Sequence, residues 1–113
     1  MQYLMLVCVN DEVPPSSSDP EPDGAMDWVE EMDGRGVRVM GQRTRPASLA
    51  TTVRKRNGEV IVSDGPFAET KEWIAGFDIL DCADLDEAIE IASKHPVALV
   101  GALELRPFWP FDE

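Results

Sequence analysis

The spacing of apolar residues predicts a strand and then a helix in the first third of the chain. Residues 3–9, YLMLVCV, form an apolar run of strand length that offers apolar side chains to both faces of a sheet. Residues 11–23 are rich in Pro, Ser and acids, and we expect them to form a mobile loop. A helix that ends at Gly34 and Gly36 should follow. Its apolar side has i, i+3, i+4, i+7 spacing and comprises Ala25, Trp28, Val29 and Met32.

The middle of the chain predicts three strands, two of them in a hairpin. In residues 37–42, strand alternation places Val37 and Val39 on one face and Arg38 and Met40 on the other. A strand within residues 50–56 meets Asn57-Gly58, a strong two-residue hairpin signal, and then the return strand EVIVSDG.

The last third predicts a strand, a helix and a final strand. In residues 73–82, Trp73, Ala75, Phe77 and Ile79 alternate with Ile74, Gly76, Asp78 and Leu80. Asp84 and Glu87 have the spacing of a capping box, and Pro96 ends the helix that they begin. The expected buried stripe of this helix is Leu85, Ala88, Ile89 and Ala92. A strand over residues 102–106, with Leu103 and Leu105 inward and Glu104 and Arg106 outward, precedes a tail of residues 107–113.

This order predicts an α+β, ferredoxin-like fold of the form βαβ(ββ)βαβ, in which two helices cover one face of a mainly antiparallel sheet. Residues 1–113 should form one domain. Two helices leave the second apolar face of the sheet uncovered, so we expect a homodimer. The tail aromatics Phe108, Trp109 and Phe111 either lie along the dimer seam or fold back onto the helices of their own chain.

Composition restricts the classes of partner. The net charge of −12 disfavours direct binding to nucleic acid or to an anionic membrane surface. The first ten residues are too short to span a membrane and lack the basic region of a signal peptide. Cys8 and Cys82 stand in apolar runs without a zinc or disulfide pattern, which favours a reducing cytoplasm. The sequence implies no cofactor and no metal site.

The segment SDGPFAETKEW contains the densest group of candidate site residues. Asp64, before a Gly65-Pro66 turn, is placed to act as a general base or ligand contact. Ligand binding is expected to involve Asp64, Gly65, Pro66, Phe67, Glu69 and Lys71. The alternative is structural: a turn at Asp64, a core contact at Phe67 and a solvated helical turn beyond it.

His95 is the only histidine, and we expect the preceding helix to favour its protonation. Asp64 and His95 form an acid/base pair if they meet across a cleft; otherwise His95 is a helix cap. The single basic cluster, on and beside the hairpin, either receives an acidic partner or ligand or, as we favour, protects the hairpin strands from unwanted pairing. It comprises Arg43, Arg45, Arg54, Lys55 and Arg56.

The segments YLMLV, DGPFAETKEWIAGFDIL, ADLDEAIEIASKHP and LELRP together resemble the YCII-related family, in particular its DGPF-domain branch. The resemblance implies a ferredoxin-like domain that pairs face to face as a dimeric α+β barrel. It also implies two functional classes. Some members resemble enzymes that use a His and Asp pair, including a dehydrochlorinase, and DGPF members often accompany extracytoplasmic-function sigma factors, which suggests regulation.

The chain departs from the enzyme-like pattern at the residues that matter most. The family histidine lies early in the first helix, where this sequence has no histidine, and His95 precedes Pro96 where the family aspartate is expected. The dyad is therefore not transferred. We expect a protein that binds a small polar or anionic ligand beside the DGPF segment. A transcription-linked interaction module and a proton-transferring lyase or isomerase remain the alternatives.

Overall fold

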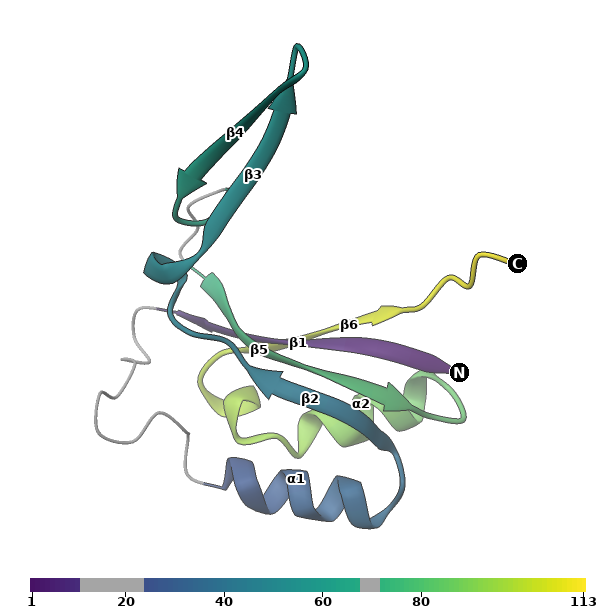
Figure 1. Cartoon of the computed structure of the whole chain (residues 1–113). Helices are drawn as coiled ribbons and strands as arrows, with labels where there is room; N and C mark the ends of the chain where they lie inside the picture. The colour runs from purple at the N-terminus through teal and green to yellow at the C-terminus, as the bar shows by residue number, and fades with distance from the viewer. Residues whose placement is uncertain (11–23, 68–71) are drawn as a thin grey trace.

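The computed structural model describes residues 1–10, 24–67 and 72–113 (Figure 1). The predicted loop at residues 11–23 lies outside the described residues. The elements are β1 (Gln2–Asn10), α1 (Ala25–Gly34), β2 (Arg38–Arg43), the 3₁₀ turn η1 (Ala47–Leu49), β3 (Thr51–Arg56), β4 (Glu59–Asp64), β5 (Glu72–Asp81), α2 (Leu85–Ser93), the 3₁₀ turn η2 (Pro96–Leu99) and β6 (Ala102–Pro107).

Four antiparallel strands form the main sheet in the order β2-β5-β1-β6, and β3 pairs only with β4. Both helices lie on one side of the sheet (Figure 1). This arrangement confirms the α+β class and is consistent with the ferredoxin-like fold. The hairpin is also confirmed: Asn57 and Gly58 have positive φ angles of 52° and 80°, as a two-residue turn of this kind requires.

The core lies between the sheet and the helices. Tyr3, Met5 and Val7 of β1 pack there against Trp28 and Met32 of α1, as the predicted apolar side of that helix requires. The indole of Trp28 donates a hydrogen bond over 2.9 Å to the carbonyl of Ile91, which ties the two helices together.

The apolar stripe predicted for the second helix is wrong in part. Ala88 and Ala92 are buried as expected, and so is Ile91, but Leu85 and Ile89 are about half exposed, at 50% and 51%. The helix is therefore rotated toward Ile91, the residue whose carbonyl Trp28 binds.

Because of two β-bulges, some strand residues face the side of the sheet opposite to the one predicted from simple alternation. One lies between Arg38 and Met40, so Arg38 turns toward the helices while Met40 lies on the opposite face. The other shifts the register between Val7 and Cys8, and Ala75 is the additional residue on β5. Because a shift of one residue exchanges the faces, Ala75 packs against the core and not beside Phe77.

The side of the sheet opposite the helices, here called the open face, carries a central group of apolar side chains. It comprises Leu4, Leu6 and Cys8 of β1, Ile74, Phe77 and Ile79 of β5, and Met40 of β2. Neither helix covers it (Figure 1). In the described part of the chain, no helix is long and apolar enough to cross a membrane.

Two segments rise on the open-face side, at opposite ends of the sheet (Figure 1). One is the β3–β4 hairpin, residues 51–64, here called the arm. The other is the tail, residues 108–113, in which Trp109 and Phe111 are exposed at 85% and 110%. The alternative that these aromatics fold back onto the helices of their own chain is therefore wrong within the protomer.

Candidate functional site

The turn at Asp64–Phe67 is fixed to the base of the arm by hydrogen bonds. Asp64 ends β4 opposite Thr51, and Gly65 follows with a φ of 94°, a conformation that favours glycine. The Gly65 N–H donates to the Ala50 carbonyl over 2.7 Å, and the Thr52 hydroxyl donates to the Gly65 carbonyl over 2.8 Å. The turn therefore has a defined position at the arm base.

The side chains around this turn are exposed in one protomer. Phe67 is 80% exposed, which contradicts its expected place in the core. The guanidinium of Arg54 reaches the Phe67 carbonyl at 3.5 Å, so a cation from the arm lies beside the turn. Asp64 is exposed as well. Of the expected ligand contacts, Glu69 and Lys71 lie outside the described residues.

His95 lies in the helix layer, between α2 and η2. It is 7% exposed, and its ring meets the ring of Trp28 edge to face with the centroids 4.9 Å apart. The Val97 N–H donates to Nδ1 of His95 over 3.1 Å, so the side chain caps η2. His95 is therefore a cap, but of the following turn η2 and not of the preceding helix α2, whose C-cap is Lys94.

Burial reverses the expected protonation of His95. Desolvation lowers the pKa of His95 from 6.5 to about 4, so the imidazole is neutral at neutral pH. The structure also does not bring His95 and Asp64 together within one protomer, because His95 lies beneath the helix-covered face while Asp64 lies at the base of the arm, beyond the open face (Figure 1).

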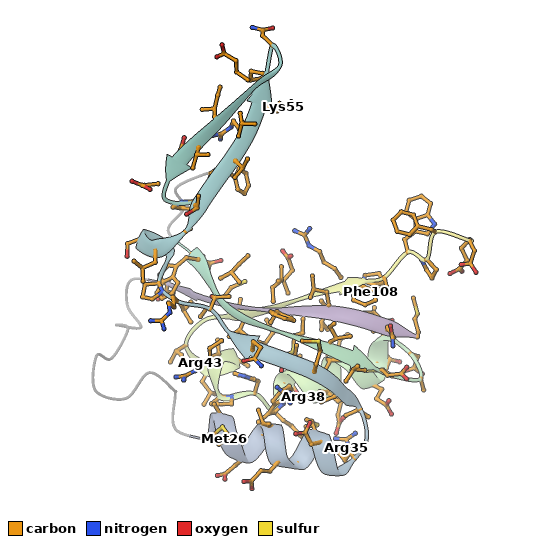
Figure 2. The ribbon with its side chains drawn as sticks, in the orientation of Figure 1. Met26, Arg35, Arg38, Arg43, Lys55 and Phe108 are labelled. Carbon is orange, nitrogen blue, oxygen red and sulfur yellow. The ribbon has the colours of Figure 1, made fainter. Side chains whose placement is uncertain are left out.

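Sequence reasoning missed a buried ion pair between Arg38 and Asp78. The Arg38 Nε donates to Asp78 over 2.8 Å, and its Nη1 binds Asp33 at the end of α1 over 3.2 Å. Asp78 is only 6% exposed, and burial raises the pKa of its carboxyl against the lowering effect of Arg38. Figure 2 shows Arg38 in the layer between β2 and α1.

The ion pair needs the glycine opposite it. A Cβ atom at Gly41 would collide with the Asp78 carboxylate and would lie 2.8 Å from Nη2 of Arg38. The sequence indicates such a pair only through Asp78, an aspartate inside an apolar strand. Simple strand alternation does not predict the bulge that turns Arg38 toward this aspartate. The geometry indicates a structural role, since the pair joins the sheet to the end of α1.

The open face combines an apolar centre with a charged margin on β6. Arg106 and Glu104 form an ion pair there over 2.6 Å. Burial and, to a smaller extent, the negative charge of Glu104 raise the pKa of the Cys8 thiol. This thiol is therefore neutral and not an activated nucleophile. Within residues 1–10, 24–67 and 72–113, no three His, Cys, Asp or Glu side chains are grouped to hold a metal ion.

Comparison with known proteins identifies the family of the chain. The model of the YCII-related domain matches residues 1–112. An uncharacterized protein of Rhizobium meliloti (strain 1021) is 40% identical over a 124-residue alignment, which covers 95% of this chain and 91% of that protein. The family match extends over both the sheet and the arm. On these grounds the chain belongs to the YCII-related family.

Proposed function

We propose that the protein is a homodimer whose two open faces enclose a cleft, and that this cleft binds a small polar or anionic molecule beside the Asp64–Phe67 turn. One observation carries the proposal. The central strands β1 and β5 are apolar on both faces, and the helices cover only one of them. A second copy would bury the other face and enclose the space above it.

The surroundings of the turn support a polar or anionic ligand. Asp64 supplies a carboxylate, Arg54 supplies a guanidinium within reach of the Phe67 carbonyl, and the turn itself is held by the arm base. The arm rises on the same side as the open face, so a second copy docked there would face this turn (Figure 1). A cation beside fixed backbone groups favours an anionic group on the ligand.

Binding is better supported than proton transfer. The one histidine of the chain, His95, is neutral and buried, and its Nδ1 accepts the Val97 N–H. It lies on the helix side of the sheet, away from the Asp64–Phe67 turn (Figure 1). A lyase or isomerase would have to work with Asp64 and groups of the second copy. A regulatory interaction module would use the exposed arm and tail instead of a cleft.

A thermal-shift screen of small polar and anionic metabolites tests the proposal, with wild type, Asp64→Ala and the matched control Asp86→Ala. Asp86 is an exposed carboxylate in the first turn of α2. We expect at least one compound class to raise the melting temperature of wild type and of the control but not of Asp64→Ala, because a ligand that binds only the native state stabilises it. If no class raises it, ligand binding is contradicted and the interaction module is favoured.

A further inference from the structure

The arm carries more exposed apolar surface than a free hairpin should. Pairing places Val53 opposite Val62 and Lys55 opposite Val60, so the three valines share one face of the arm. They are 65%, 61% and 64% exposed, in the order Val53, Val62, Val60. An isolated two-stranded hairpin is marginally stable in water. Packing of this valine face against another surface would therefore stabilise the arm.

The arm is also long enough to pass a second sheet. Six-residue strands extend about 20 Å, whereas sheets that pack face to face lie about 10 Å apart. The Cα radius of gyration, 15.9 Å, exceeds the roughly 13 Å of a compact chain of this length, as projecting segments require. In a face-to-face dimer the arm would reach the side of the partner.

The tail offers the complementary surface. Phe108, Trp109 and Phe111 are exposed at 38%, 85% and 110%, and the acidic residues Asp112 and Glu113 end the chain. The Trp109 indole donates to the Glu113 carbonyl over 3.3 Å, so the tail forms a turn. Figure 2 shows Phe108 on the open-face side, at the end of the sheet opposite the arm, and Lys55 toward the tip of the arm.

The charges of the arm and the tail favour contacts between an arm and a tail over contacts between two arms or two tails. The arm carries the cations Arg54, Lys55 and Arg56 and the anions Glu59 and Asp64, so it has a small net positive charge in a chain whose net charge is −12. If the two-fold axis ran along the strands, arm would face arm and tail would face tail, which brings like charges together. An axis across the strands instead brings each arm to the end of the open face from which the acidic tail of the other protomer rises.

We propose that in the homodimer the arm of each protomer packs against the tail of its partner, with the valine face on the tail aromatics and the Lys55 end beside Asp112 and Glu113. The two contacts close the dimer at both ends of the open faces. This inference rests on the proposed homodimer and adds to it the identity of the contacting segments.

Zero-length carbodiimide cross-linking tests the contact, because it joins an amine to a carboxylate only where they touch. A mixture of ¹⁴N- and ¹⁵N-labelled full-length chains, equilibrated and then cross-linked, reports by mass whether a link joins two chains. We expect links from Lys55 to Asp112 or Glu113 with mixed isotopes. Lys94, which lies 3.4 Å from Glu31 and 3.3 Å from Glu90 in the same chain, supplies the internal control with unmixed isotopes.

Charge exchange supplies a second test in solution. Lys55→Glu, and separately Asp112→Lys with Glu113→Lys, should each weaken dimerisation about tenfold, and the three substitutions together should restore it, because Lys55 shares the valine face of the arm. A wild-type dimer without arm-to-tail links, or without restoration, overturns this inference and leaves the homodimer intact. A wild-type monomer at micromolar concentration overturns both.

Discussion

At the scale of single residues, the role of His95 depends on its burial. Its folded-state pKa of about 4 lies below the ordinary value of 6.5, so between these values the unfolded chain binds a proton that the folded chain does not. Stability is unaffected by this group above pH 6.5 and falls as the pH decreases toward 4. The shift corresponds to a loss of about 3 kcal/mol.

The variant His95→Asn tests this account, because an asparagine oxygen can accept the Val97 N–H but does not titrate. Urea unfolding at several pH values should show a steeper loss of stability from pH 6.5 to 4 in wild type than in the variant. Comparing the two chains removes the contribution of the many carboxylates. Equal slopes would show that His95 is hydrated or protonated in the folded protein.

The Arg38–Asp78 pair makes Gly41 a packing requirement. We expect Gly41→Ala to lower the free energy of unfolding by about 1–3 kcal/mol, because the new methyl group would displace the buried carboxylate and would also lie 2.7 Å from the backbone carbonyl oxygen of Phe77. Gly34→Ala is the matched control, since nothing lies within 4 Å of a Cβ atom at that position. Denaturant unfolding of both variants is the measurement. A Gly41→Ala chain as stable as the control would contradict the close packing of Gly41 against both the ion pair and the Phe77 backbone.

At the scale of elements, local signals predicted where strands and helices begin more reliably than which side they bury. The capping box, the Asn57-Gly58 turn and the glycine end of α1 depend on a few neighbouring residues, and the structure confirms them. The face of Arg38 and the burial of Ile91 depend on bulges and helix rotation. Those follow from packing between distant segments, which periodicity does not record.

The start of α2 gives an element-scale prediction. The Asp84 carboxylate accepts from the Glu87 N–H over 2.9 Å, and the Glu87 carboxylate accepts from the Ala83 N–H over 3.1 Å. Asp84→Ala should therefore destabilise the protein by about 1 kcal/mol in thermal or urea unfolding. Asp86→Ala, in the same turn, should change stability by only a few tenths of a kcal/mol. Equal effects would contradict a specific role for the cap.

At the scale of the whole molecule, the sequence predicted the sheet with two helices and an apolar second face. It did not predict that the hairpin leaves the main sheet as an arm. The hairpin strands pair with each other through the same turn and the same alternation whether the hairpin joins the main sheet or projects from it. The site was predicted in part. Asp64 lies in a fixed turn as expected, whereas Asp64 and His95 do not meet within one protomer, because they lie on opposite sides of the sheet.

Sedimentation velocity at micromolar concentration, with wild type and Leu6→Glu measured side by side, decides whether the open face is the interface of a homodimer. Leu6 lies near the middle of the open face, opposite Phe77 and Glu104, so a carboxylate there would be buried only in the dimer. We predict that wild type sediments at twice the chain mass of 12.5 kDa and that the variant sediments as a folded monomer. A wild-type monomer with its open face exposed to water would contradict the account.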